Sequence, residues 1–277
     1  MRAELVVPAS LDDVGSSPGT VLLAGGTEVV PQLREGLLEA DTLIDISGLV
    51  PTGVSGTRIG AGTTLAELEA SDAVPAALRE ASRLAASPQL RTMGTIGGNL
   101  LQSTRCWYWR LGYDCRLRGG DRCHARDGES REHAIFANDF CASAHPSDVA
   151  AALLSLGARV RTSRRELGIA ELFRVPEAGD PRTLALEPGE VLLELDVPQA
   201  DASVYLKAMD RKRFAFPLVG VAAVRRGATT TVALAGVAPV PWLLEGSLDD
   251  ATPLPATAYK VELARALVAR ALASIEP

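Results

Sequence analysis

The sequence predicts an α+β fold, because its strands and its helices come in separate groups along the chain. The N-terminal group is a short strand–helix–strand unit over residues 20–46. Strands predominate between residues 190 and 237, and an amphipathic helix over residues 259–275 comes after them. A chain of 277 residues is long enough for a large core and for two domains.

The N-terminal unit is predicted from two apolar runs on either side of a helical stretch. Residues 20–24 (TVLLA) and 42–46 (TLIDI) are short apolar runs, which are typical of buried strands. Between them, residues 28–40 (EVVPQLREGLLEA) have the composition of one short helix. This order predicts a βαβ-like unit at the start of the chain.

Helices are the main elements predicted for the middle of the chain. Residues 51–62 are rich in turn-forming residues and contain one short strand. Residues 63–71 (TTLAELEAS) begin with a threonine that can cap a helix, and residues 74–87 place apolar side chains at helical spacing. Ser147 can cap a further helix, which Gly157 ends.

The last third of the chain is predicted to be a strand-rich domain that follows a linker. Residues 162–189 are polar and contain prolines, which is typical of a linker between domains. The helix at residues 259–275 is expected to have at least four turns. The predicted strands cover residues 190–197, 203–210, 217–225 and 229–237.

Composition and charge argue against several classes of protein. The net charge is −6, which disfavours non-specific binding to nucleic acid. No apolar run reaches roughly 18 residues, so no membrane span is predicted. The apolar stretch near the N-terminus is too short for a signal peptide and is followed by acidic residues. The expected location is therefore cytoplasmic.

Two glycine-rich loops predict a site for a phosphate-containing ligand. The first is LLAGGTEVV (22–30), directly after a predicted strand, and the second is TMGTIGGN (92–99). Glycines let a phosphate approach backbone N–H groups, and nearby Thr and Asn side chains add donors. Neither loop has the G-x-G-x-x-G fingerprint, so a Rossmann fold is not supported. Each loop alone is also compatible with a tight turn, but the pair beside a cysteine cluster favours a dinucleotide cofactor.

The HPSD stretch at residues 145–148 is a third polar feature. The Asp148 carboxylate is a candidate acceptor for a ribose or ribityl hydroxyl group. The simpler interpretation is that it places a negative charge at the N-terminus of a helix, where such a charge is favourable.

All four cysteines lie within one 36-residue window, among Arg, Asp, Gly and His residues. Two disulfides are one interpretation, but a reducing cytoplasm argues against them. A metal or iron–sulfur site is the favoured alternative, with His124 as a competing ligand. The spacing C-x8-C-x7-C-x17-C matches neither the compact ferredoxin pattern nor the paired cysteines of zinc sites. The candidate ligands are Cys106, Cys115, Cys123 and Cys141.

Several motifs together resemble the FAD-binding subunit of the xanthine dehydrogenase and carbon monoxide dehydrogenase family of molybdenum hydroxylases. They occur in the family's order and cover most of the chain. The pattern GGNLLQ-x-TRC-x-Y-x-R is similar to a subgroup that includes periplasmic aldehyde oxidoreductases and 4-hydroxybenzoyl-CoA reductase, in which a cysteine-bearing insertion binds a [4Fe–4S] cluster. The motifs are LLAGGTEVVPQLREG, RIGAGTTLAELE, ASPQLRTMGTIGGNLLQ, HPSD, LEPGEVLLEL, YLKAMDRKRFAFPLVGVA and LAGVAPVPW.

The resemblance implies a two-part FAD-binding domain of the vanillyl-alcohol oxidase (PCMH) type and a small, shortened α/β domain after it. The first FAD-binding subdomain would cover residues 1–50. The second would cover residues 51–165 and carry an iron–sulfur loop at 103–141. The C-terminal domain would then span residues 166–277.

The resemblance also implies roles for individual residues. The two glycine loops would hold the FAD pyrophosphate, Asp148 would contact the sugar portion, and Leu192 and Lys207 would lie near the isoalloxazine ring. Residues 105–131 contain seven Arg and four Asp or Glu, and this excess of positive charge would compensate an anionic cluster, unless it is a solvated basic loop. The implied FAD contacts are Ala24, Gly25, Gly26, Thr27, Glu28, Thr95, Ile96, Gly97, Gly98, Asn99, Asp148, Leu192 and Lys207.

The implied function is electron transfer, with FAD and a [4Fe–4S] cluster as cofactors. FAD would exchange electrons with NAD, oxygen or another acceptor, while a large molybdopterin-binding subunit and a small [2Fe–2S] subunit would complete the enzyme. One alternative is a stand-alone FAD and iron–sulfur oxidoreductase that acts on a small organic substrate. A metal-binding scaffold without flavin is a weaker alternative, because both glycine loops are intact. No catalytic acid or base is evident from the sequence.

Overall fold

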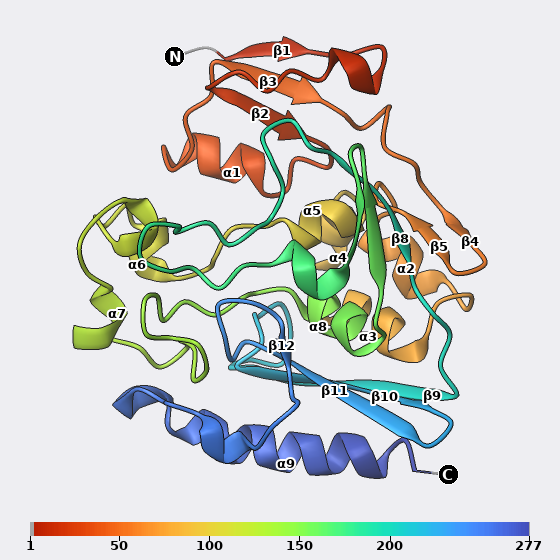
Figure 1. Cartoon of the computed structure of the whole chain (residues 1–277), viewed down its shortest axis with the longest axis vertical. Coiled ribbons are helices and arrows are strands. Elements are labelled where there is room, and N and C mark those ends of the chain that lie inside the picture. Colours follow the sequence, from red (N-terminus) through yellow and green to blue (C-terminus); the bar gives the residue numbers. More distant parts are fainter. Residues whose placement is uncertain (1–2, 277) are drawn as a thin grey trace.

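The computed structural model describes residues 3–276, which form three β-sheets arranged from one end of the molecule to the other (Figure 1). The N-terminal sheet lies at one end and the C-terminal helix at the opposite end. Helices lie between the sheets, so the predicted α+β class is confirmed. Among the helices described, none has both the length and the apolar character that a membrane span needs.

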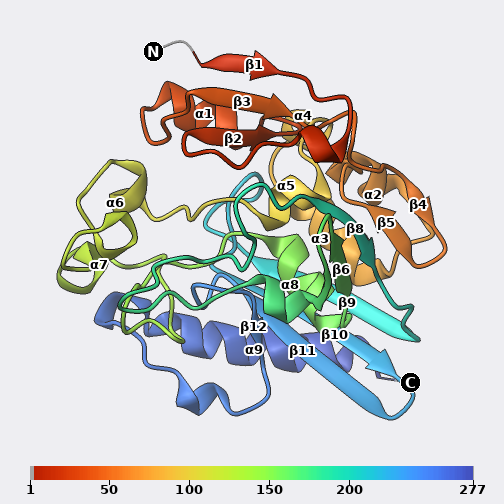
Figure 2. The ribbon, with the colours of Figure 1, turned by 45° about the horizontal axis from the view of Figure 1, so that its top comes forward.

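The N-terminal sheet consists of β1 (Glu4–Val6), β2 (Thr20–Leu23) and β3 (Thr42–Asp45). Its strands are parallel and lie in the order β1-β3-β2 (Figure 2). A parallel pair needs a crossover connection, and α1 (Val29–Arg34) supplies it between β2 and β3. The predicted βαβ-like unit is therefore confirmed. The sequence did not reveal β1 or the short 3₁₀ helix η1 (Leu11–Asp13).

The second sheet consists of β4 (Val54–Ser55), β5 (Arg58–Gly60), β6 (Arg159–Thr162), β7 (Glu166–Gly168) and β8 (Leu192–Asp196). Its order is β4-β5-β8-β6-β7, and all its pairs are antiparallel. The prediction of a linker at residues 162–189 is wrong, because β6 and β7 form a hairpin there and a 3₁₀ helix, η3 (Ile169–Leu172), follows. Since β8 pairs with both β5 and β6, the sheet crosses the predicted boundary after residue 165.

The middle layer consists of α2 (Leu65–Ala70), α3 (Ala76–Leu84), α4 (Pro88–Arg91), α5 (Ile96–Leu100) and α8 (Asp148–Ser155). Thr64 caps α2 by accepting the Glu67 amide at 3.2 Å, and Ser147 caps α8 by accepting the Ala150 amide at 3.0 Å. Both caps match the prediction. Every residue of α8 is buried, so the chain around its N-terminus is fixed in the core.

The C-terminal sheet consists of β9 (Ala202–Ala208), β10 (Val219–Arg226), β11 (Thr229–Ala235) and β12 (Trp242–Leu243). Helix α9 (Tyr259–Ala273) packs on one face of this antiparallel sheet, and α3 and α8 pack on the other (Figure 1). Three of the four strands predicted from the sequence are in this sheet, while the first is β8. Before α9 come two 3₁₀ helices, η4 (Leu248–Asp250) and η5 (Pro255–Thr257).

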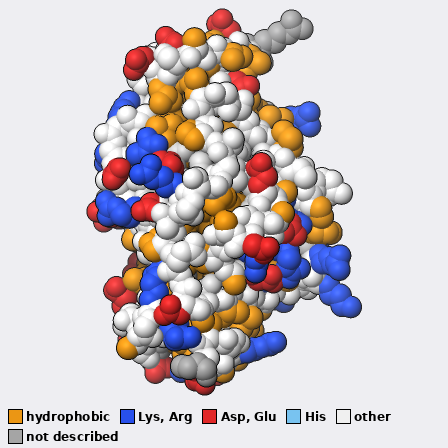
Figure 3. Space-filling view, turned by 90° about the vertical axis from the view of Figure 1, so that its right-hand side faces the viewer, with side chains coloured by type: hydrophobic (Ala, Val, Ile, Leu, Met, Phe, Trp, Pro, Cys, Tyr) orange, Lys and Arg blue, Asp and Glu red, His pale blue; other side chains and the backbone are white. Residues whose placement is uncertain are grey.

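Residues 103–141, which we call the cysteine segment, form a lobe at one side of the molecule (left in Figure 1). The lobe has little regular structure, and its short helices are α6 (Trp107–Arg110), η2 (Arg116–Arg118) and α7 (His124–Asp127). Cys123 packs there with Ala142 and Leu254 in a small apolar core of its own. The opposite side of the molecule carries basic and acidic side chains interspersed with apolar ones (Figure 3).

Candidate functional site

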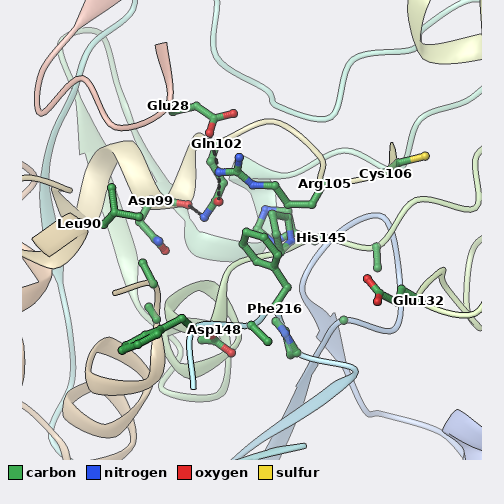
Figure 4. A pocket seen from close by; sticks show the side chains of 18 of the residues that line it. Glu28, Leu90, Asn99, Gln102, Arg105, Cys106, Glu132, His145, Asp148 and Phe216 are labelled. Carbon is green, nitrogen blue, oxygen red and sulfur yellow. Dashed lines mark hydrogen bonds and ion pairs between the residues drawn. The ribbon is translucent and has the colours of Figure 1, made fainter. Parts of the chain in front are cut away.

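A cavity of about 810 Å³ opens between the N-terminal unit, the cysteine segment and the loop before β10 (Figure 4). Small-molecule and cofactor sites typically measure roughly 300–1,000 Å³, so the cavity has the size of a cofactor site. Its lining comes mainly from residues 27–35, 85–110, 132–148 and 210–218. These stretches are distant in sequence and are brought together only by the fold.

The two glycine loops meet beside this cavity. A Cβ atom on Gly25 would lie 1.9 Å from the carbonyl oxygen of Met93, so only glycine permits the loops to pack this closely. A Cβ atom on Gly94 would lie 3.4 Å from Oγ1 of Thr27. The two loops that were expected to act together therefore do lie together, and contact between the loops explains the glycine at position 25.

The first loop has a run of free backbone donors beside the cavity, which Thr27 and Glu28 line. Within residues 3–276, the amides of residues 25–28 make no hydrogen bond, and Gly26 among them has a φ of +72°. Successive free amides in a turn of this kind form a concave site for an anion. The second loop differs from our expectation, because its amides other than that of Thr95 already have acceptors in the protein. These bonds run from Ile96 to Thr63 O (2.8 Å), Gly97 to Ala61 O (2.9 Å), Gly98 to Thr95 Oγ1 (3.0 Å) and Asn99 to Thr95 O (2.8 Å).

Asp148 forms a buried ion pair at the cavity. Its carboxylate accepts one hydrogen bond from the Tyr205 hydroxyl and another from Lys207 Nζ, the latter at 2.8 Å. Lys207 Nζ also donates to the carbonyl oxygen of Leu84 at 3.0 Å. Burial raises the pKa of Asp148, while the Lys207 ammonium acts in the opposite direction. Each carboxylate oxygen has one protein partner and retains a lone pair for a ligand hydroxyl.

The remaining predicted residues divide into those that line the cavity and those behind it. Lys207 reaches the cavity only through Asp148, because its side chain is 1% exposed. Leu192 is buried in β8 and does not line the cavity. The residues behind the lining also include Ala24, Gly25, Gly26, Thr95, Ile96 and Gly97. The predicted residues that line the cavity are Thr27, Glu28, Gly98, Asn99 and Asp148, together with Cys106.

Glu28 links the N-terminal unit to the cysteine segment. Its carboxylate accepts hydrogen bonds from Arg105 at 2.5 Å, from Arg110 at 2.6 Å and from Gln32 at 2.6 Å. Only 16% of the Glu28 side chain is exposed, so this ion-pair network is largely buried. Arg105 and Arg110 were expected to compensate an anionic cluster, but their partner in the structure is the Glu28 carboxylate.

The loop between β9 and β10 supplies an aromatic wall that the sequence did not predict. Phe214 and Phe216 are about half exposed, and both line the cavity. The guanidinium carbon of Arg105 lies 5.1 Å from the centre of the Phe216 ring, which is a cation–π contact. Alternating aromatic residues in the motif RKRFAFP were the available signal for this wall.

The four cysteines lie in one lobe as free thiols, and three of them are buried. Cys123 and Cys141 interact directly, and this interaction lowers the pKa of Cys123 to about 5 and raises that of Cys141. Cys106 instead contacts His133, with 3.2 Å between Sγ and Nε2, and burial raises its pKa to about 11. Within residues 3–276, no three His, Cys, Asp or Glu side chains lie close enough together to hold a metal ion. The thiols therefore do not form a ready-made cluster site in this structure.

The expected competing ligand, His124, is otherwise engaged. Its Nε2 lies 2.9 Å from the carbonyl oxygen of Asp114, and its ring stacks on Tyr108. These contacts give His124 a structural role within the cysteine segment.

Comparisons of sequence identify relatives of known type. A family model described as the FAD-binding domain in molybdopterin dehydrogenase matches residues 3–200. The FAD-binding subunit PaoB of an aldehyde oxidoreductase from Escherichia coli K12 is 35% identical over 249 residues, which cover 83% of this chain and 78% of PaoB. The medium chain of a carbon monoxide dehydrogenase from Afipia carboxidovorans is 45% identical over 85 residues, which cover 28% of this chain and 30% of that one.

Comparisons of structure agree on the fold. The reconstituted carbon monoxide dehydrogenase from Oligotropha carboxidovorans aligns with a TM-score of 0.71 at 22% identity, over 99% of this chain and 98% of that one. Quinoline 2-oxidoreductase from Pseudomonas putida 86 aligns with a TM-score of 0.69 at 18% identity, over 99% and 97%. The predicted PCMH-type fold is thus confirmed. Because the family model spans most of the chain and the PaoB match spans most of both chains, this protein belongs to the family of FAD-binding subunits of molybdenum hydroxylases, which are flavoprotein parts of oxidoreductases.

Proposed function

We propose that the cavity holds FAD and that the chain is the electron-transferring flavoprotein subunit of a molybdenum hydroxylase. The observation that carries the proposal is the row of free amides at residues 25–28, beside a cavity of cofactor size. Membership of a family of FAD-binding subunits supports the same cofactor.

The pyrophosphate is assigned to the amides of residues 25–28 and to Oγ1 of Thr27. Asn99 borders the same part of the cavity, and its side chain is held by a hydrogen bond from Ser147 Oγ at 2.5 Å. Asp148 is assigned to a sugar or ribityl hydroxyl group, because its carboxylate retains free lone pairs. Lys207 contributes indirectly, by holding that carboxylate in place.

When bound, FAD supplies reversible electron acceptance, and the protein supplies binding, orientation and electrostatics. The second glycine loop, most of whose amides are already paired, supports the first from behind. The Glu28 network fixes the first loop against the cysteine segment. Phe214 and Phe216 provide an apolar wall that shields the cavity from water.

We further propose that the cysteine segment binds a [4Fe–4S] cluster through all four cysteines. The support is that every cysteine of the chain lies in one lobe, as a free thiol. The lobe also carries an excess of arginine, although Arg105 and Arg110 are paired with Glu28. Within residues 3–276, no three His, Cys, Asp or Glu side chains lie close enough together to bind a metal ion. Cluster assembly therefore requires the thiols to move closer together.

The proposed partners are a large molybdopterin-binding subunit and a small [2Fe–2S] subunit. The support is that matched relatives are named as medium chains or FAD-binding subunits. Co-purification of both subunits with the tagged chain from its native host tests this. A chain that purifies alone and oxidises a small organic substrate with its own flavin would instead be the stand-alone enzyme.

The FAD site is tested by comparing Gly26→Ala with Gly36→Ala. Both glycines have left-handed backbones, with φ of +72° and +67°, so both substitutions strain the chain to a similar extent. Only Gly26→Ala distorts the free amides. We expect wild type and Gly36→Ala to bind FAD and Gly26→Ala to lose most of it. The FAD content is measured from the absorbance of the folded proteins. Wild-type protein that takes up no FAD would refute the proposed function.

The cluster is tested by iron and sulfide analysis of anaerobically purified protein. We expect about four iron and four sulfide per chain, the content of a [4Fe–4S] cluster. Cys115→Ser should lose the cluster but keep flavin, whereas Ser130→Ala, a buried residue of the same segment, should keep both. Zinc in place of iron, or unchanged iron in Cys115→Ser, counts against the cluster.

A further inference from the structure

Glu28 belongs to both of the proposed cofactor sites. Its backbone amide is the last of the four amides at residues 25–28 that have no acceptor within residues 3–276, and the FAD pyrophosphate is assigned to this row. Its side chain extends to the cysteine segment, where only 16% of it is exposed. The backbone and the side chain of one residue therefore connect the first glycine loop to the segment that carries all four cysteines.

The Glu28 carboxylate holds the chain on both sides of Cys106. Before Cys106, the backbone amide of Ser103 donates to Glu28 Oε1 at 3.2 Å, and Arg105 donates to Oε2 at 2.5 Å. After Cys106, Arg110 at the end of α6 donates to Oε1 at 2.6 Å. A buried carboxylate with several charge-assisted hydrogen bonds fixes its partners in one geometry.

Further contacts fix Cys106 itself. Its amide donates to Thr104 Oγ1 at 3.1 Å, and its Sγ lies 3.2 Å from His133 Nε2. Arg110 Nε also donates to the carbonyl oxygen of Thr104 at 2.9 Å. Residues 111–114, which follow α6, are exposed by contrast. Because the thiols must move closer together to hold a cluster, we expect Cys106 to stay in place and the outer part of the segment to close on it.

A network shared by two sites couples the binding of their ligands. Bound FAD would fix the first glycine loop, and with it the Glu28 carboxylate and the chain around Cys106. A bound cluster would fix the same network from the side of Cys106. The ligand that binds second therefore loses less conformational entropy, because the first has already ordered the groups that both need.

We propose that Glu28 is a positioning residue that couples the two sites, so that the iron–sulfur cluster and FAD strengthen each other's binding. This inference rests on the proposed function, including the proposed cluster. Coupling between two binding sites is reciprocal, so FAD must also slow the loss of the cluster. FAD still binds without the cluster, but more weakly.

The test is a thermodynamic cycle in the full chain. Flavin fluorescence gives the dissociation constant of FAD for flavin-stripped protein, once with its cluster and once after anaerobic removal of the cluster by a chelator. We expect cluster-loaded wild type to bind FAD about five times or more tightly than cluster-free wild type, as is typical of coupled sites. Glu28→Gln keeps the amide and the side-chain shape but loses the charge that holds both arginines, so its ratio of the two constants should approach one.

The matched control is Glu190→Gln. Glu190 is a buried carboxylate that pairs with Arg165 at 3.0 Å, and neither residue lines the cavity or lies in the cysteine segment. This variant should keep the ratio of wild type. If Glu28→Gln does not fold, Arg110→Met removes one of the two arginine contacts and should reduce the ratio.

A ratio of one in wild type, or an unreduced ratio in folded Glu28→Gln, would overturn the inference. An equally reduced ratio in Glu190→Gln would also overturn it, since a general loss of stability would then explain the effect. Failure of wild-type protein to bind FAD would refute the proposed FAD site instead, and failure to retain iron would refute the proposed cluster. The coupling would be refuted together with either site.

Discussion

Gly25→Ala should separate the two glycine loops. The added Cβ atom would lie 1.9 Å from the carbonyl oxygen of Met93 and 2.9 Å from the carbonyl carbon. Both sides of this contact are backbone, so no change of side-chain rotamer can relieve it. Comfortable non-bonded contacts are roughly 3.5 Å, and the loops must therefore move apart by about 1 Å or more.

The size of the effect follows from that displacement. Overpacking of this kind costs about 1–3 kcal/mol of unfolding free energy. In a chain of this size, each kcal/mol lowers the Tm by about 2–4 °C. We therefore expect Gly25→Ala to lower the Tm by several degrees. FAD affinity should fall as well, because the displaced loop carries the free amides of residues 25–28.

The matched control is Gly48→Ala. A Cβ atom there would meet no atom within 4 Å, so this variant should be as stable as wild type or slightly more stable. The assay is differential scanning calorimetry of apoprotein, followed by titration with FAD. A Gly25→Ala protein with the Tm and FAD affinity of wild type would refute the close contact between the loops.

Three further predictions concern other parts of the molecule. Gly97→Val should lower the Tm, because a Cβ atom there lies 3.0 Å from the carbonyl oxygen and 3.1 Å from the Cβ of Ala61; an unchanged Tm, measured by calorimetry, would contradict this. Glu28→Gln should cost about 1–3 kcal/mol in urea unfolding by leaving two arginines unpaired, while Glu80→Gln, in an exposed pair with Arg83, should change stability very little. Burial lowers the pKa of Lys260 from 10.5 to about 7, so between these pH values the unfolded chain binds more protons than the folded one and stability rises with pH. The free energy of unfolding of Lys260→Met should therefore rise less between pH 7 and pH 10. A rise equal to that of wild type would refute the lowered pKa of Lys260.

Local signals in the sequence predicted most elements of the fold. Thr64 and Ser147 cap the helices that they were expected to cap, because capping depends on a few neighbouring residues. The βαβ-like unit and the strands around the tight turn at Gly227 also follow from local apolar patterns. Strand pairing does not follow from such patterns, since β8 pairs with both β5 and β6, which lie far apart in the sequence. We accordingly propose a domain boundary after β8, near residue 200, in place of one at 165.

The candidate site was predicted in part. Thr27, Glu28 and Asn99 line the cavity as expected, because glycine-rich loops are easy to recognise in a sequence. His145 also lines the cavity and was not predicted to do so, although HPSD was noted, since the burial of its ring results from the fold. Arg105 pairs with Glu28, which is 77 positions away in the sequence, so no local pattern predicts this ion pair.

The two glycine loops look alike in sequence yet have different roles. In the second loop, the amides of Ile96 and Gly97 donate hydrogen bonds to the carbonyl oxygens of Thr63 and Ala61. These amides are therefore not available to a ligand. In the first loop, the amides of residues 25–28 have no such partner, and a buried anion is the acceptor that would satisfy them. A glycine-rich motif therefore identifies a place where backbones approach closely. The partner of each amide, which only the fold decides, determines whether that place supports the protein or binds a ligand.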